Sequence, residues 1–365
     1  MKILHIITSL ELGGAEKLLS ELIPLQKKLG YDVELMILSD INSVFEKDLI
    51  KRGIKVSVSK YNSKVSPLNI FAIAEKIRKE NYDIVHVHLV HAQYWTRFAK
   101  ILDFNRKRRY ITTEHSTSNR RRNSIVFKLI DRFVFRGFDK IVSISEATEK
   151  SLKEWIGGDE KNYCVIANGV DLSHFENVYP ISRDEIGVEN SDTVLMMVSR
   201  FQAAKNQKGV VLALKSLSEE YKVVFVGDGV LERDVQEFAR KEGVEDRVRF
   251  LGLRKDIPQL LKAADIVIQY SFFEGFGITA VEGMASHKPV IASDVPGLAE
   301  VVRGAGFLCS NDNPKELAKL ILKLKDEKLY KEIADKCLER SKKFTIENSA
   351  KEYLELYKKT LEREW

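Results

Sequence analysis

Short apolar runs alternate with amphipathic helical segments along almost the whole chain, and this alternation is the strongest limit on its fold. Each run is apolar at successive positions rather than at every second one. Such runs are typical of strands that are buried on both faces of a parallel sheet. The helical segments between them supply the crossovers that parallel pairing requires. The sequence therefore predicts an α/β protein whose parallel sheets are covered by helices on both faces.

The alternation occurs as two separate series. The first series of predicted strands lies at 3–8, 33–38, 55–58, 84–87, 110–113, 141–144 and 164–166. The second lies at 194–198, 223–226, 248–251, 266–268, 290–292 and 307–308. Residues 176–190 between the series are polar and contain Pro180, which indicates an interdomain linker. A chain of 365 residues also suits two cores better than one.

We therefore expect two Rossmann-like domains, at 1–178 and 179–345. Residues 346–365 form a further helical segment with apolar positions at Ala350, Tyr353 and Tyr357. The periodicity does not decide which domain this helix covers, and packing back onto the N-terminal domain is the arrangement that we consider.

Positive charge is concentrated in residues 97–140, which hold 13 basic and 4 acidic side chains, whereas the whole chain has a net charge of +6. A local field of this sign attracts phosphate-bearing partners, such as an anionic membrane surface, a diphosphate-linked acceptor or a nucleic acid. Aromatic residues are sparse among the basic residues themselves, where Phe104 and Tyr110 are the nearest ones, and this disfavours base stacking. We therefore expect this segment to meet an anionic membrane surface, and we expect no nucleic-acid partner.

The cysteines and the N-terminus indicate where the protein is found. Cys164, Cys309 and Cys337 are scattered, which disfavours a disulfide framework or a zinc site and fits a reducing cytosol. The apolar run at 3–8 is too short for a signal peptide, and no stretch approaches the roughly 18 apolar residues of a membrane span. We expect a cytoplasmic protein, with any membrane contact peripheral and at the inner face.

The most informative window is 271–285, which reads SFFEGFGITAVEGMA and follows a predicted strand. Ligands of open α/β sheets bind beyond the carboxyl ends of the strands. The free N–H groups of Gly277, Ile278 and Thr279 at the start of the next helix form an anion site. One turn further on, Glu282 is suited to accept both hydroxyls of a ribose.

Glu274 precedes this helix in the loop and is suited to accept sugar hydroxyls across the phosphate. The alternative is an ordinary strand–loop–helix turn with two solvated glutamates. The spacing of Glu274 and Glu282 around Gly-Phe-Gly, with Met-Ala-x-x-x-Pro-Val-Ile-Ala-Ser after it, argues against that alternative.

With this pair of glutamates, separated by seven residues, the sequence resembles the retaining glycosyltransferases of the GT-B fold, family four, also called group 1. The resemblance implies an N-terminal acceptor domain and a C-terminal donor domain that face each other across a deep cleft. It implies transfer of a hexose-type sugar from a UDP-sugar or GDP-sugar to a saccharide or lipid-linked acceptor, as in the synthesis of cell-surface polysaccharides and glycolipids. In that family the first glutamate, here Glu274, binds the transferred sugar, and the second, here Glu282, binds the ribose.

Other features of the family recur in order. Arg200 and Lys205 match its basic pair, whose charge would stabilise the departing diphosphate. Gly13 and Gly14 match its loop over the diphosphate and acceptor, although turn chemistry explains two glycines equally well. His115 matches a histidine near the transferred sugar, although the flanking Glu114 departs from the commoner forms.

The resemblance also places the nucleotide base near Leu253, where backbone groups would read the base edge. We take Glu274, His115, Arg200 and Lys205 as the candidate catalytic residues.

No metal site or separate cofactor is expected. His86, His88 and His91 could bind zinc, but histidines at a strand end more often form a hydrogen-bond network. The sequence has no Asp-x-Asp, so charge neutralisation would fall to basic side chains and a helix N-terminus. Two alternatives stay open: a nucleic-acid or anionic-surface binding protein on a Rossmann-like scaffold, and a GT-B sugar-nucleotide epimerase.

Overall fold

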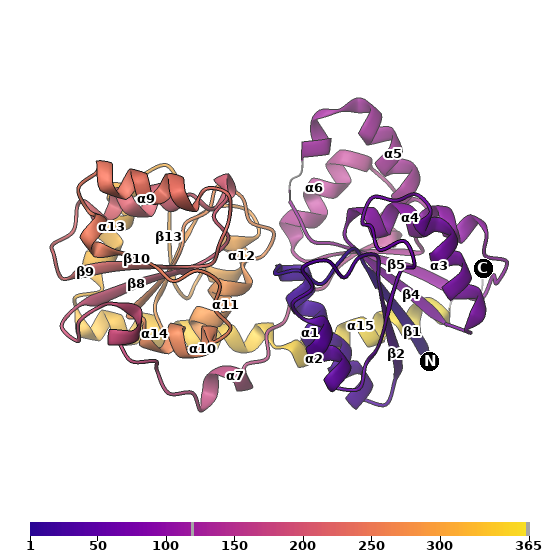
Figure 1. Ribbon diagram of the computed structural model, residues 1–365, viewed down its shortest axis with the longest axis horizontal. Helices are drawn as coiled ribbons and strands as arrows, with labels where there is room; N and C mark the ends of the chain where they lie inside the picture. Colours follow the sequence, from indigo (N-terminus) through magenta and orange to yellow (C-terminus); the bar gives the residue numbers. More distant parts are fainter. Residues whose placement is uncertain (118–119, 363–365) are drawn as a thin grey trace. The chain divides into compact units, whose positions relative to one another are not determined.

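The computed structural model describes residues 1–117 and 120–362, which fall into two compact units. Unit 1 comprises residues 1–169 together with the C-terminal segment from 346, and unit 2 comprises residues 170–345 (Figure 1). Positions 118–119 of the predicted basic segment and 363–365 of the predicted final helix lie outside the described residues.

Unit 1 is built on a parallel sheet of seven strands in the order β3-β2-β1-β4-β5-β6-β7. Most positions of these strands are buried on both faces, as the continuous apolar runs predict. The strands are β1 (Lys2–Ile7), β2 (Asp32–Ile37), β3 (Lys55–Val58), β4 (Ile84–His88), β5 (Arg109–Glu114), β6 (Lys140–Ser143) and β7 (Tyr163–Val165).

Helices cover both faces of this sheet. Their bounds are α1 (Gly14–Lys28), α2 (Glu46–Lys51), α3 (Asn69–Lys79), α4 (Val90–Ile101), α5 (Ile125–Phe135), α6 (Glu146–Ile156) and α15 (Ile346–Leu361). Alternate residues of β1 serve two cores: Ile3 and Ile7 pack in the core that contains α1 and α15, whereas Leu4 and Ile6 pack in the core that contains α3.

Unit 2 repeats the design with six parallel strands in the order β10-β9-β8-β11-β12-β13. The strands are β8 (Thr193–Val198), β9 (Tyr221–Val226), β10 (Val248–Phe250), β11 (Ile266–Gln269), β12 (Val290–Ser293) and β13 (Phe307–Cys309). The helices are α7 (Ser173–Glu176), α8 (Gln207–Leu214), α9 (Glu232–Lys241), α10 (Ile257–Ala263), α11 (Ile278–Ala285), α12 (Leu298–Val302), α13 (Pro314–Lys323) and α14 (Glu327–Ser341).

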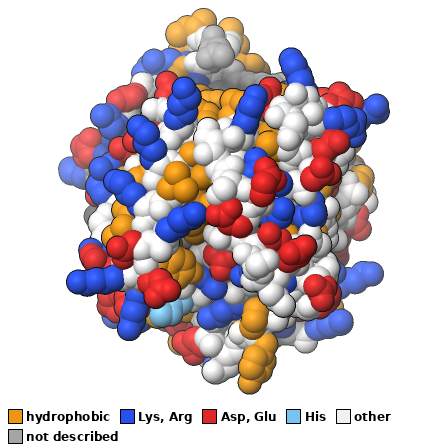
Figure 2. Space-filling model, turned by 90° about the vertical axis from the view of Figure 1, so that its left-hand side faces the viewer, with side chains coloured by type: hydrophobic (Ala, Val, Ile, Leu, Met, Phe, Trp, Pro, Cys, Tyr) orange, Lys and Arg blue, Asp and Glu red, His pale blue; other side chains and the backbone are white. Residues whose placement is uncertain are grey.

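Short 3-10 helices complete the connections. They are η1 (Arg120–Asn123), η2 (Glu160–Asn162), η3 (Asp184–Ile186), η4 (Ala203–Lys205), η5 (Glu245–Arg247) and η6 (Lys342–Phe344). The surface in Figure 2 mixes basic and acidic side chains, with apolar ones in small groups, as expected of a solvated surface.

The two sheets share the doubly wound order in which the chain adds strands outward on one side and then on the other. The predicted architecture of two parallel, Rossmann-like α/β domains is therefore confirmed. In such sheets the order reverses at one point, and ligands bind beyond the strand ends at that point. It lies between β1 and β4 in unit 1 and between β8 and β11 in unit 2.

The sequence placed the domain boundary at 178–179, whereas unit 2 begins at Val170. Val170 donates its N–H to the carbonyl of Phe344 at 2.9 Å and forms an isolated bridge with Thr345, so it belongs to unit 2. At the other end α15 is part of unit 1, where it packs on α1. No described helix has both the length and the apolar character that crossing a bilayer requires.

Candidate active site

The loops that follow β8 and β11 meet at the reversal point of the unit 2 sheet. Phe272 in the second loop donates its N–H to the carbonyl of Ala204 in the first, at 2.8 Å. Lys205 and Glu274, one from each loop, form an ion pair. Their side chains are only 14% and 16% exposed, so the two charges are held against each other in a largely dry position. The structure thus brings together two of the predicted catalytic residues.

Helix α11 begins directly beyond this ion pair. Gly277 precedes its first residue and has a φ of +96°, a conformation that favours glycine. A Cβ at this position would come within 2.6 Å of the Leu298 side chain, so the close packing also requires glycine. The N–H groups at Gly277, Ile278 and Thr279 belong to the first turn and have no partner within the helix. They can receive an anion beside Lys205.

Glu282 lies on the same helix but is only 3% exposed. It is therefore not the solvated surface glutamate of the alternative interpretation. Ser286 donates its hydroxyl to the Glu282 carbonyl at 2.9 Å, at the C-terminal end of the helix. Its predicted contact with a ribose stays a prediction.

Arg200 follows β8 with an exposed side chain, for which the described residues supply no ion-pair partner. Its backbone is fixed instead, since its carbonyl accepts a hydrogen bond from the Gln207 side chain at 2.9 Å. The next residue, Phe201, donates its N–H to the carbonyl of Asp228 at 2.6 Å. The backbone of this loop is therefore held by hydrogen bonds, while the guanidinium of Arg200 is exposed.

Leu253, the predicted base contact, lies in the loop after β10 and is 52% exposed. β10 is the edge strand, separated from β8 by β9. The neighbouring Gly252 accepts the N–H of Gly227 at 2.8 Å, which ties this loop to the one after β9. Leu253 is thus at the same end of the sheet as Lys205 but farther from the reversal point.

In unit 1 the predicted residues also follow strand ends. Gly13 and Gly14 lie at the start of α1, which follows β1, with Gly13 as its N-cap. His115 directly follows β5. Leu89, between β4 and α4, has a φ of 67° and a ψ of 152°, a conformation that costs a non-glycine residue roughly 1–3 kcal/mol. Strain of this kind tends to occur at functional sites, and here it lies at the reversal point of the sheet.

A network of buried histidines connects these strand ends. His5 Nδ1 lies 3.2 Å from His88 Nε2, and His88 Nδ1 lies 3.2 Å from His115 Nε2. Burial lowers the pKa of His5 to about 4 and that of His115 to about 3. Burial also holds the pKa of His86 and of His88 well below the usual range. All four rings are therefore neutral at pH 7.

The histidines at 5, 86 and 88 form the one group in the described part of the chain whose ligand atoms lie close enough for a metal ion, within 4.8 Å of one another. All six of their ring nitrogens, however, have hydrogen-bond partners. Besides the contacts above, His86 bonds Tyr357 at 2.6 Å and Thr113 at 2.8 Å, and His5 bonds Gln26 at 2.9 Å. The arrangement is that of a hydrogen-bond network, and His91 does not belong to the group.

Sequence reasoning missed His5 and Gln26. His5 lies inside an apolar strand, and only the register of β1 against β4 pairs it with His86. Gln26 is fully buried on α1, where its spacing gives no sign of a polar contact.

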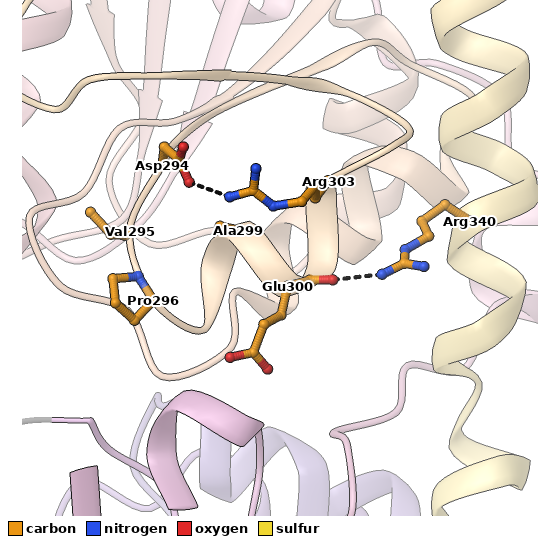
Figure 3. Close-up of a pocket in the computed structure, with 7 residues that line it drawn as sticks. All are labelled: Asp294, Val295, Pro296, Ala299, Glu300, Arg303 and Arg340. Carbon is orange, nitrogen blue, oxygen red and sulfur yellow. Dashed lines mark hydrogen bonds and ion pairs between the residues drawn. The ribbon is translucent and has the colours of Figure 1, made fainter. Parts of the chain in front are cut away.

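A pocket of about 560 Å³ opens beside the unit 2 site. Figure 3 shows its lining, in which Asp294 pairs with Arg303 at 2.6 Å and Arg340 donates to the carbonyl of Glu300 at 2.6 Å. The predicted site residues do not line this pocket. The loop after β12, which lines the pocket, packs closely on the loop that carries Glu274. A Cβ at Gly297 in the first loop would come within 2.5 Å of the Gly275 carbonyl in the second.

Comparison with known proteins agrees with this architecture. The family model described as Glycosyltransferase Family 4 matches residues 12–174, and the one described as Glycosyl transferases group 1 matches residues 179–344. The chain is 26% identical over 320 residues to N-acetyl-alpha-D-glucosaminyl L-malate synthase of Bacillus anthracis, covering 83% of this chain and 82% of that one.

It is 25% identical over 351 residues to a Campylobacter jejuni enzyme, N-acetylgalactosamine-N,N'-diacetylbacillosaminyl-diphospho-undecaprenol 4-alpha-N-acetylgalactosaminyltransferase, covering 93% and 94% of the two chains. Among solved structures, Alr3699/HepE of Anabaena in complex with UDP-glucose shares the fold. Its TM-score is 0.84 at 24% identity, and the match covers 98% of this chain and 100% of that one.

Proposed function

The chain belongs to the glycosyl transferases of group 1, and from this we propose that it transfers a hexose-type sugar from a nucleotide diphosphate sugar to a saccharide or lipid-linked acceptor, with net retention and without a metal ion. The observation that carries the proposal is the ion pair of Lys205 and Glu274 at the start of α11. It places a cation, free N–H groups and a carboxylate in one position, as a diphosphate joined to a sugar requires.

We assign the donor to unit 2. Lys205, Arg200 and the N-terminus of α11 would bind the two phosphates, because each supplies positive charge or N–H donors. Glu274 would then lose its ion pair with Lys205 and accept hydrogen bonds from sugar hydroxyls. Glu282 would accept hydrogen bonds from the ribose hydroxyls. The solved relative that contains UDP-glucose supports UDP as the nucleotide. The acceptor is assigned to unit 1, beside Gly13 and Gly14, and His115 of the same unit is assigned to the transferred sugar.

For the chemical step we propose a displacement on the face from which the diphosphate departs. The bond between the anomeric carbon and the phosphate oxygen breaks, and the acceptor oxygen bonds to the same face of that carbon. The acceptor's proton passes to the departing phosphate oxygen. Arg200 and Lys205 stabilise the charge that develops on the phosphate, which makes catalysis a matter of positioning and electrostatics.

A thermal-shift screen tests the donor assignment. UDP, GDP and ADP, with and without sugars, are each added without a divalent cation, since a ligand that binds only the native state raises its Tm. We expect one nucleotide and its sugar conjugate to raise the Tm, and EDTA to leave the shift intact. No shift with any of them would reject the donor site. NMR of the product then reports the anomeric configuration, and an inverted product would reject the proposed step.

Product analysis of the selected nucleotide sugar, incubated with the protein but without acceptor, separates the epimerase alternative. An epimerase converts the nucleotide sugar itself, so a new sugar nucleotide formed without acceptor would reject transfer as the main reaction. The nucleic-acid alternative loses part of its support, because several basic side chains of 97–140 are paired or buried within unit 1. Arg108 pairs with Asp103 at 2.6 Å, for example, and Arg121 pairs with Asp131 at 2.8 Å.

An apolar strip on α5 supports a membrane-bound acceptor. Ile125, Val126 and Leu129 are 70%, 60% and 60% exposed, and Phe133, one turn further on, is 45% exposed. Because α5 packs on α4 and α6, it lies at the outer edge of unit 1 (Figure 1). Arg136 at its end is exposed and can meet lipid phosphates. A helix of this composition suits peripheral binding to an anionic surface.

Vesicle co-sedimentation tests this surface. We expect the protein to bind vesicles that contain anionic lipid, and the Leu129→Glu variant to lose most of that binding. Val230→Glu is the matched control, because Val230 is 90% exposed but lies in unit 2. Equal binding to vesicles with and without anionic lipid would reject α5 as the membrane-binding surface. An equal loss of binding in both variants would reject it as well.

A further inference from the structure

Four buried or half-buried side chains form a continuous hydrogen-bonded line through unit 1. Gln26 Oε1 lies 2.9 Å from His5 Nε2, and His5 Nδ1 lies 3.2 Å from His88 Nε2. His88 Nδ1 lies 3.2 Å from His115 Nε2. The line begins on α1, passes through the middle of β1 and the end of β4, and ends at the residue after β5. The last atom along it, His115 Nδ1, is buried and has no partner within the described structure.

The amide oxygen of Gln26, at the start of the line, determines which nitrogen of each histidine ring carries the proton. An amide oxygen can only accept, so His5 Nε2 must carry a hydrogen and His5 Nδ1 must be a bare acceptor. His88 Nε2 then donates to His5, which leaves His88 Nδ1 bare. His115 Nε2 donates to His88 in the same way. His115 Nδ1 is therefore left with a lone pair and no proton.

We propose that Gln26, His5 and His88 are positioning residues that hold His115 as its Nε2–H tautomer, so that Nδ1 presents a lone pair to a hydroxyl of the carbohydrate. The inference rests on the proposed function, since it deepens the role of His115 at the sugar. A bare nitrogen binds an O–H donor and repels a phosphate or carboxylate oxygen. The line would therefore make His115 select a sugar hydroxyl rather than an anionic group.

Burial supports this interpretation independently. His5, His86 and His88 are completely inaccessible, so no water can supply a proton that would reverse one ring alone. The reverse direction would require Gln26 to turn its amide and all three rings to move their protons together. The orientation of the Gln26 amide therefore decides in which direction the hydrogen bonds of the line are donated.

Nitrogen NMR of the histidine side chains tests the direction of the line. In the wild-type protein we expect His115 to have a protonated Nε2 and a bare Nδ1. Gln26→Met removes the orienting oxygen at similar volume, and we expect His115 then to populate both tautomers. Tyr353→Phe is the control, because its hydroxyl bonds Thr113 at 3.3 Å on the same buried face but lies outside the line. It should leave the tautomer unchanged.

A protonated Nδ1 on wild-type His115 would overturn the proposal. So would a Gln26→Met protein that keeps one tautomer. If that variant does not fold, the wild-type spectrum alone still decides the direction. The ligand is tested by adding the nucleotide sugar selected in the thermal screen, and its nucleoside diphosphate alone. We expect the Nδ1 signal to move only with the sugar, and an equal response to the nucleotide would overturn the role of the hydroxyl.

Activity provides the last readout. We expect Gln26→Met to lower kcat about tenfold, the effect of one misdirected hydrogen bond, with little change in KM for the donor. Tyr353→Phe should keep its kcat, and an equal loss in both variants would indicate a structural role and overturn the proposal. A line with the expected direction in a protein that transfers no sugar would reject the proposed function alone.

Discussion

At the scale of single residues, the proposed donor site depends on the ion pair of Lys205 and Glu274. Both side chains are largely buried, and an unpaired charge in such a position is costly. Each group therefore satisfies the other until a ligand replaces it. In the proposed complex, Lys205 would contact the diphosphate and Glu274 would contact the sugar. The ion pair would thus be replaced by two separate sets of contacts with the donor.

This exchange predicts different losses for the two partners. Lys205→Met should weaken binding of the nucleoside diphosphate by about tenfold to a hundredfold, because it removes a charged hydrogen bond to phosphate. Glu274→Gln should not weaken that affinity, because it releases Lys205 from the ion pair, but it should lower transfer by roughly a hundredfold or more, because it alters the contact with the sugar. Calorimetry with the nucleotide and steady-state transfer rates separate the two effects.

Lys208→Met is the control for the lysine. Lys208 lies on the following helix, α8, where its ammonium stacks over Phe238 at 5.4 Å and does not contact Glu274. Equal losses of nucleotide affinity in both lysine variants would show that general charge, and not the position of Lys205, binds the phosphates.

At the scale of elements, α1 contains an unusual interior proline. Pro24 cannot donate to the carbonyl of Ser20, so this carbonyl lacks its helical partner. Arg52, which follows α2, donates to it instead at 2.9 Å. The guanidinium thus replaces one helical hydrogen bond and ties α2 to the helix that carries Gln26.

A double-mutant cycle measures this replacement. Arg52→Ala should lower the free energy of unfolding by about 1–3 kcal/mol, because it leaves the Ser20 carbonyl unsatisfied in a largely buried helix. In a Pro24→Ala background the alanine N–H can bond that carbonyl, so the same substitution should cost less than half as much. Urea unfolding of the four proteins gives the coupling, and equal costs in both backgrounds would refute the compensation.

The bounds of single elements could largely be predicted, but contacts between them could not. The strand predicted at 194–198, for example, is β8, Thr193–Val198, because a continuous apolar run defines it locally. The line from His5 to His115 depends on strand order and register, which one sequence does not reveal. Residues 97–140 seemed to be a basic face, yet Arg108 is buried against Asp103 while α5 exposes apolar side chains.

At the scale of the whole molecule, the two units should respond differently to acid. Unit 1 buries four neutral histidines, at 5, 86, 88 and 115, each with its pKa lowered by burial. The unfolded chain binds their protons below about pH 6.5, and the folded chain does not. The free energy of unfolding that the neutral rings contribute is therefore complete above about pH 6.5. It is lost as the pH falls toward 4, by about 1.4 kcal/mol per pH unit for each histidine.

Urea unfolding followed by tryptophan fluorescence at pH 7, 6 and 5 measures this loss, since Trp95 and Trp155 both lie in unit 1. Glu114 opposes the trend, because burial raises its pKa and gives a contribution of the opposite sign. A midpoint that stays constant over this range would show that the histidines are hydrated or charged in the folded protein.

The last prediction concerns α15, the C-terminal helix that belongs to unit 1. Tyr353 and Tyr357 of α15 are both completely buried, and they cover the face on which the histidine line lies. Burying such a side chain stabilises a fold by about 1.5–3 kcal/mol, so removal of residues 346–365 should cost unit 1 much of its stability. Unit 2 makes its core from residues 170–345 alone and should stay folded. Hydrogen exchange should then show protected amides in β8 and β11 but not in β1 and β4. Equal protection in both sheets would mean that α15 is dispensable, and equal loss would mean that the two units fold only together.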